Sequence, residues 1–161
     1  MAQKILLAVD GSEASMKAVR YVGETLVGCK EIKIVLFSVL PELPKGLADI
    51  LSGDFAKKAI GLSQAVEYIE SLRFQKEKEL KEAQEKAKKI LINSGISEEN
   101  VEMKLTRKKE GIARDIIREV ETGDYDTVVV GRRGMGRAFF MGSVSTKIVN
   151  NLRNCTIWVV D

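Results

Sequence analysis

The sequence predicts an α/β protein with an open parallel β-sheet that helices cover on both faces. Short apolar runs, typical of strands buried on both faces, alternate along the chain with longer segments in which apolar residues recur every three or four positions. Five such runs and four such segments are present, which favours a layered α/β sheet. With 161 residues and no internal repeat, the chain is expected to form a single domain over residues 1–161.

The first predicted strand is Lys4 to Val9, and the turn Asp10-Gly11-Ser12 ends it. The hydroxyl of Ser12 can accept a hydrogen bond from a free backbone N–H in the first turn of a helix, so Ser12 is expected at the N-cap. A helix is predicted over residues 14–26, because apolar side chains recur there at four-residue spacing.

The second predicted strand is Ile32 to Leu40, which Pro41 stops. Residues 41–65 contain several glycines and prolines, and their role stays open between a lid over a crevice and a contact in a dimer. A long helix is predicted over Gln64 to Asn93, with a C-cap at Asn93-Ser94-Gly95. Its expected buried stripe is Leu80, Ala83, Ala87, Ile90 and Leu91, and its expected ion pairs are Glu77–Lys81, Glu82–Lys86 and Glu85–Lys89.

The rest of the chain continues the alternation of strands and helices. A third strand is predicted over Val101 to Thr106, and the next helix follows it. That helix should present Ile112, Ile116, Ile117 and Val120 inward, followed by a strand at Thr127 to Val130, a helix at Ser143 to Leu152 and a strand at Thr156 to Val160.

The composition limits the classes of function. Apolar residues make up 45% and charged residues 30% of the chain, as in soluble globular proteins. No apolar run approaches the ~20 residues of a membrane span and no signal-peptide stretch is present, so no membrane partner and a cytoplasmic location are expected. The absence of histidine excludes Ser-His-Asp triads and favours a binding protein over an enzyme. A net charge of +3 is too modest for nucleic-acid binding to be expected.

The segment from Val128 to Ile148, VVVGRRGMGRAFFMGSVSTKI, combines closely spaced glycines, several arginines and a predicted helix start. Glycines let the backbone approach a ligand closely, and the N–H groups at a helix start attract anions. No acidic residue lies between Gly131 and Asn154. A phosphate group is therefore the expected ligand of this loop.

Two common phosphate loops do not fit the segment. A Walker A loop places lysine beside its second glycine, whereas Gly142 is followed by Ser143. A dinucleotide fingerprint that begins at Gly134 would place Phe139 at its third glycine position. The remaining pattern is G-x-x-G, then seven residues, then G-S.

This pattern resembles the nucleotide loop of the universal stress protein family, in which G-x-x-G is followed by about nine residues and then by G-[ST]. The resemblance covers nearly the whole chain, since KILLAVDGSEASMKAV, IKIVLFSVL, DYDTVVVGRRG and CTIWVVD are similar to the family's first, second, fourth and last strands with their flanking residues. It implies a Rossmann-like fold, related to that of the adenine nucleotide alpha hydrolases, with strand order 3-2-1-4-5. It also implies a stress-response regulator that binds ATP or AMP, with Mg²⁺ or Mn²⁺ held through the phosphates as an option, and at most slow ATP hydrolysis.

In such a sheet the crossovers leave the first and fourth strands in opposite directions, and a crevice opens between the carboxyl ends of these strands. Asp10 follows the first strand and Gly131 ends the fourth, so both are expected at the crevice. The resemblance implies that the backbone of Val39 contacts adenine and that the glycine loop contacts ribose and phosphate. The expected nucleotide-binding residues are Ala8, Val9, Asp10, Val39, Val130, Gly131, Arg132, Gly134, Gly142, Ser143, Val144 and Ser145.

Structural roles compete with these binding roles. Asp10 can accept a hydrogen bond from a ribose hydroxyl, or it can stabilise the turn before the helix, and the two roles are compatible. Ser143 can donate to a phosphate or cap its helix. Of the arginines in the loop, Arg132, Arg133 and Arg137, one at most is expected at the phosphates.

The loop is shorter than the family pattern by two residues, which removes roughly 6 to 7 Å from its reach. Two hypotheses therefore stand. The intact G-x-x-G and G-S elements favour a nucleotide-binding stress protein, whereas the short spacing favours a dimeric regulatory interaction protein without nucleotide. Phe139 and Phe140 can pack against the sheet edge or fill the hollow.

The last strand is expected at an edge of the sheet, where an exposed apolar strand invites pairing with another chain. Family members commonly dimerise through this strand, so the resemblance implies a homodimer with Trp158 near the interface. The alternative is that the protein's own helices cover Trp158. The strand consists of Thr156, Ile157, Trp158, Val159 and Val160.

Overall fold

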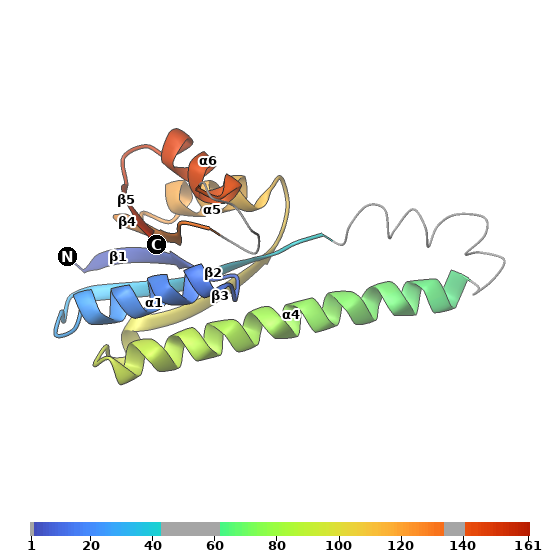
Figure 1. Ribbon diagram of the computed structural model, residues 1–161, viewed down its shortest axis with the longest axis horizontal. Helices are drawn as coiled ribbons and strands as arrows, with labels where there is room; N and C mark the ends of the chain where they lie inside the picture. The colour runs from blue at the N-terminus through green and yellow to red at the C-terminus, as the bar shows by residue number, and fades with distance from the viewer. Residues whose placement is uncertain (1, 43–61, 134–140) are drawn as a thin grey trace.

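The computed structural model describes residues 2–42, 62–133 and 141–161, and the predictions for the loop phenylalanines and for residues 43–61 lie outside these ranges. Five parallel strands form one sheet in the order β3-β2-β1-β4-β5 (Figure 1), which confirms the predicted fold class and strand order. The strands are β1 (Gln3–Ala8), β2 (Ile32–Leu40), β3 (Val101–Arg107), β4 (Thr127–Gly131) and β5 (Thr156–Val160). The helices are α1 (Glu13–Thr25), α4 (Leu62–Asn93), α5 (Ile112–Thr122) and α6 (Ser143–Asn151), with a 3-10 turn, η1, at Glu98–Asn100.

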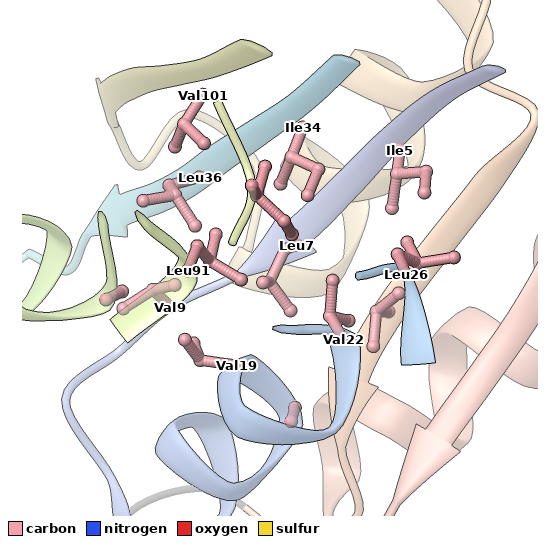
Figure 2. Packing of buried hydrophobic residues seen from close by; sticks show 14 of the residues in the cluster. Ile5, Leu7, Val9, Val19, Val22, Leu26, Ile34, Leu36, Leu91 and Val101 are labelled. Carbon is pink, nitrogen blue, oxygen red and sulfur yellow. The ribbon is translucent and has the colours of Figure 1, made fainter. Parts of the chain in front are cut away.

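Helices α1 and α4 cover one face of the sheet, and α5 and α6 cover the other (Figure 1). Alternate residues of the central strand β1 enter the two cores: Ile5 and Leu7 pack with α1 and α4, and Leu6 packs with α5 and α6. All three side chains are fully buried, and each such burial stabilises the fold by about 1.5 to 3 kcal/mol. Figure 2 shows Leu7 in the middle of the first cluster, with residues of α1 and α4 around it.

The predicted ends of the elements agree with the structure to within two residues. Ser12 is the N-cap of α1, and its hydroxyl accepts a hydrogen bond from the backbone N–H of Ser15 at 3.2 Å, as predicted. Gly95 follows α4 with φ at +101°, in the left-handed region that suits glycine, and the N–H of Ile96 donates back to the carbonyl of Leu91. The predicted C-cap of the long helix is thereby confirmed.

Helix α4 runs well past the end of the sheet (Figure 1). The pair Glu77–Lys81 forms at 2.9 Å, as predicted. The predicted pairs Glu82–Lys86 and Glu85–Lys89 were wrong, since they are not among the ion pairs of the described residues, and Glu82 lies 4.0 Å from Lys78 instead. A charged side chain on the surface of a helix can pair with a residue three or four positions before it or after it, and the energies of these pairs are similar. Four-residue spacing alone therefore does not predict which pair forms. No helix within the described ranges has the length and apolar character needed to cross a membrane.

A buried glutamine, Gln84, attaches α4 to the sheet. Its side chain is 3% exposed, and its Nε2 donates to the carbonyl oxygens of Leu36 and Lys104 and to the hydroxyl of Ser38 at 2.9 to 3.1 Å. The hydroxyl of Ser38 in turn donates to the carbonyl oxygen of Val9 at 2.6 Å. These bonds satisfy polar groups that water cannot reach, and they fix α4 relative to the carboxyl ends of β1 and β2.

Candidate functional site

A cavity of about 540 Å³ opens at the carboxyl edge of the sheet, where β1 and β4 lie side by side. Its size falls in the range of pockets that hold small ligands, about 300 to 1,000 Å³. The polypeptide leaves β1 toward α1 on one face and leaves β4 toward α6 on the other face, which is the arrangement that opens a crevice in sheets of this kind.

The cavity gathers most of the residues that the sequence predicted. Ten of the twelve predicted binding residues line it. Gly134 lies outside the described ranges, and Arg132 is not among the lining residues. The ten are Ala8, Val9, Asp10, Val39, Val130, Gly131, Gly142, Ser143, Val144 and Ser145.

Asp10 stabilises the turn that leads into α1, because its Oδ1 accepts a hydrogen bond from the backbone N–H of Ser12 at 2.8 Å. Gly11 lies between them with φ at +81°, a conformation that glycine adopts without steric cost. The Asp10 side chain is exposed and lines the cavity. Since each carboxylate oxygen accepts more than one hydrogen bond, the turn leaves Asp10 able to accept from a ligand hydroxyl.

The end of β4 lies against the start of α1. A Cβ atom added at Gly131 would come within 2.7 Å of the carbonyl carbon of Ala14 and within 2.9 Å of its Cβ. Only glycine permits this approach of the two backbones. Gly131 therefore has a packing role, whatever ligand the cavity holds.

The N-terminus of α6 opens onto the cavity. The Arg132 carbonyl oxygen accepts hydrogen bonds from the N–H of Gly142 at 2.8 Å and from the hydroxyl of Ser145 at 2.7 Å, which joins the end of β4 to the start of α6. Gly142 is the N-cap and supplies no side-chain cap. The first N–H groups of α6 have no partners within the helix, and Ser143 and Val144 at this end of the helix line the cavity. The positive end of the helix dipole favours an anion there.

The charged residues of the cavity wall are Asp10, Lys76 and Arg133. The Nε atom of Arg133 is buried and has no hydrogen-bond partner among the described residues, which suits it to a ligand acceptor. Arg132 pairs with Asp161 at 2.7 Å, and an Nη atom of Arg133 lies 4.0 Å from the same carboxylate. The hydrogen bond from Arg132 holds the pKa of the Asp161 carboxyl below its usual value.

An apolar wall completes the cavity, and sequence reasoning missed most of it. Phe37 and Val39 of β2, Leu80 of α4, and Ile112 and Ile116 of α5 line this side. The prediction that Ile112 is buried on the inner face was wrong, since Ile112 is 37% exposed at the first position of its helix, where it borders the cavity. The signal in the sequence is an isoleucine at the first position of the helix that follows the carboxyl end of β3. Such a surface suits a flat, largely apolar group such as a nucleobase.

A second depression follows the solvent side of α4, between Phe74 and Lys89. All the residues that line it come from this one helix, and all of them except Phe74 are lysines or glutamates. It is therefore a groove of the helix surface. In the described part of the chain, no group of three His, Cys, Asp or Glu side chains is placed to hold a metal ion.

The fold and the cavity define an α/β protein with a crevice at the carboxyl edge of a parallel sheet. The chain matches the universal stress protein family over residues 1–161, and it belongs to this family. No curated protein sequence matches it.

Solved structures share the fold. The hypothetical protein MJ0577 has a TM-score of 0.71 and 22% identity, over 99% of this chain and 96% of that one. The universal stress protein from Archaeoglobus fulgidus in complex with dAMP has a TM-score of 0.56 and 18% identity, over 100% and 98% of the two chains. A universal stress protein family protein from Arabidopsis thaliana with AMP bound has a TM-score of 0.53 and 20% identity, over 98% and 90%.

Proposed function

We propose that this universal stress protein binds an adenine nucleotide, AMP or ATP, in the crevice between β1 and β4 and acts as a regulator in a stress response. One observation carries the proposal: a single cavity collects ten residues that the glycine-loop resemblance implicated, from segments at opposite ends of the chain. Family members from Archaeoglobus fulgidus and Arabidopsis thaliana that are bound to dAMP and AMP support the same ligand class.

The chemistry of the wall matches the parts of a nucleotide. The base would pack on the apolar side around Val39, and a ribose hydroxyl would donate to the carboxylate of Asp10. The phosphate would lie at the N-terminus of α6, where backbone N–H groups and the Ser143 hydroxyl donate. The unpartnered Nε of Arg133 adds a charged donor at this end.

Isothermal titration calorimetry with protein freed of bound nucleotide tests the proposal. We expect AMP to bind with one site per chain, and Asp10→Asn to weaken its binding about 5- to 20-fold, because a hydrogen bond to a charged group contributes about 1.5 to 3 kcal/mol. Glu13→Gln is the matched control, since Glu13 is exposed in the first turn of α1 and does not line the cavity. Titration of ATP with and without Mg²⁺ shows whether a metal carried by the phosphates contributes.

The short glycine loop favours a second candidate, a dimeric regulatory protein without nucleotide. Seven residues separate Gly134 from Gly142, and the loss of roughly 6 to 7 Å of reach is comparable to the size of a phosphate group. The calorimetry separates the two candidates. Absence of binding for both AMP and ATP would contradict the first proposal and leave the second.

We also propose that two copies pair through β5. This strand lies at the sheet edge, and its pairing partner within the described residues is β4. Val159 is 37% exposed there, and an uncovered apolar edge strand favours pairing with another chain. Trp158 is half-buried and meets the ring of Tyr21 edge to face at 5.9 Å, so α1 covers part of this side chain.

A further inference from the structure

Helix α4 contributes two residues to the cavity wall, Lys76 and Leu80, which lie one helical turn apart on the same face. Leu80 is 5% exposed and packs into the body of the protein. One turn further along, Gln84 is hydrogen-bonded to β2 and β3. These two anchors fix the rotation of α4 and so direct the Lys76 side chain toward the cavity.

The ion pair that Lys76 forms in this structure is weak. Its Nζ lies 3.1 Å from the Oε2 of Glu79, and the two side chains are 45% and 50% exposed. Exposed ion pairs of this kind contribute little because water competes for both charges. Glu79 does not line the cavity. The ammonium group can therefore exchange Glu79 for a ligand anion at small cost.

The positive charges around the cavity favour a ligand anion that can contact both sides of it. Lys76 comes from the layer of α1 and α4, whereas Arg133 follows β4 on the way to α6 in the opposite layer. Asp10 is the one carboxylate of the described lining, so two cations and one anion face the cavity. A phosphate monoester carries about −1.5 to −2 charges at pH 7, which both Lys76 and Arg133 can attract, although an Nη atom of Arg133 also lies 4.0 Å from Asp161.

We propose that Lys76 is a phosphate-contacting residue of this site, and that the phosphate of a bound nucleotide replaces Glu79 as its partner. The ligand then bridges the two helical layers, and the part of α4 that extends past the sheet becomes attached to the occupied site (Figure 1). This inference rests on the proposed nucleotide binding. It makes α4 the element whose mobility reports whether a ligand is bound.

The test compares ligands that differ in phosphate. Calorimetry is run with adenosine, AMP and ATP on the wild-type protein, Lys76→Gln and the control Lys78→Gln, whose lysine is exposed on α4 and outside the cavity. We expect Lys76→Gln to weaken AMP and ATP about 5- to 20-fold and to leave adenosine within about twofold. Lys78→Gln should leave all three unchanged. Glu79→Gln, which removes the competing carboxylate, should tighten AMP binding.

Failure of this inference is distinct from failure of the proposed function. If the wild-type protein binds AMP but Lys76→Gln binds it equally well, or loses adenosine to the same extent, the role of Lys76 is wrong and nucleotide binding stands. If the wild-type protein binds neither AMP nor ATP, both proposals fall. Hydrogen exchange gives an independent readout: AMP should slow exchange over residues 66–79 in the wild-type protein, and equal slowing in Lys76→Gln would contradict the bridge.

Discussion

The backbone of Gly131 touches that of Ala14 so closely that a Cβ at residue 131 would lie 2.7 Å from the Ala14 carbonyl carbon. The contact joins the end of β4 to the start of α1, directly beside the crevice. A glycine that the loop motif associates with a ligand is thus also required by the packing of the protein. We therefore expect a substitution at Gly131 to change the stability of the protein, whatever the cavity holds.

Gly131→Ala should destabilise the protein by about 1 to 3 kcal/mol, because the added methyl group must displace backbone atoms of α1. Urea unfolding followed by circular dichroism measures the change. Gly111→Ala is the control, since a Cβ there would meet nothing within 4 Å. Equal stability of the two variants would show that the contact is looser than described.

Ser143→Ala and Ser145→Ala should separate binding from loop structure. The hydroxyl of Ser145 donates to the carbonyl oxygens of Arg132 and Gly142, so its removal should cost about 1 kcal/mol of stability. The Ser143 side chain is exposed at the start of α6. Its loss should leave stability unchanged and weaken AMP about 3- to 10-fold. Thermal unfolding and calorimetry on both variants check the pair, and the reverse pattern would exclude the phosphate role of Ser143.

Gln84→Leu should destabilise the protein by about 2 to 4 kcal/mol, because buried acceptors on β2 and β3 lose their donor. Gln75→Leu, on the exposed side of the same helix, is the matched control and should change stability by less than about 0.5 kcal/mol. Chemical denaturation measures both. A small effect of Gln84→Leu would mean that packing alone holds α4 in place.

The two cysteines should react with thiol reagents at different rates. Burial raises the pKa of the Cys155 thiol above its usual value, and the nearby Asp126 carboxylate adds to the shift, whereas Cys29 is exposed. Brief treatment with iodoacetamide at pH 8 should label Cys29 well before Cys155, as peptide mass spectrometry can show. Labelling in denaturant, where both thiols are exposed, is the control.

The same shift has a consequence for stability. The folded protein holds the Cys155 proton more tightly than the unfolded chain does. This contribution to stability is fully present below the ordinary thiol pKa, and it is lost as the pH rises through the raised value. Cys155→Ser should therefore flatten the decline of stability above about pH 8.5. An unchanged decline would assign it to other groups.

Val159→Lys should produce a monomer if β5 forms the proposed interface, because a lysine on the edge strand must lose water to pair with a second chain. Light scattering after size-exclusion chromatography measures the mass. Val149→Lys is the control, since Val149 is similarly exposed, at 39%, but lies on α6. A dimer that persists in Val159→Lys and dissociates in Val149→Lys would place the interface elsewhere.

The strands could be predicted closely because their signals are local. Ile32–Leu40 and Thr156–Val160 have the predicted bounds. A short, mainly apolar run that ends at a proline or at a polar residue is typical of a buried strand. The crevice residues at the ends of β1 and β4 followed from the sheet order, which the family resemblance supplied. The spacing of residues in the sequence would not by itself have predicted that Asp10 and Gly142 line the same cavity.

The roles of α4 could not be predicted in the same way. Gln84 was not among the residues predicted to be buried, although it shares the stripe of Leu80, Ala87 and Leu91, which is a signal that the sequence does contain. Lys76 carries no such signal. The angle at which α4 crosses the sheet decides which lysine meets the cavity, and tertiary packing sets that angle.

Titration of ¹⁵N-labelled protein with AMP, followed by two-dimensional NMR, locates the ligand directly. We expect the largest amide shifts at residues 9–12, 39, 131–133 and 142–145. The turns at Gly28, Gly95 and Gly123, which lie at the opposite edge of the sheet, near the amino ends of the strands, should show no shifts. Shifts confined to that opposite edge, or no shifts at millimolar AMP, would contradict a nucleotide site between β1 and β4.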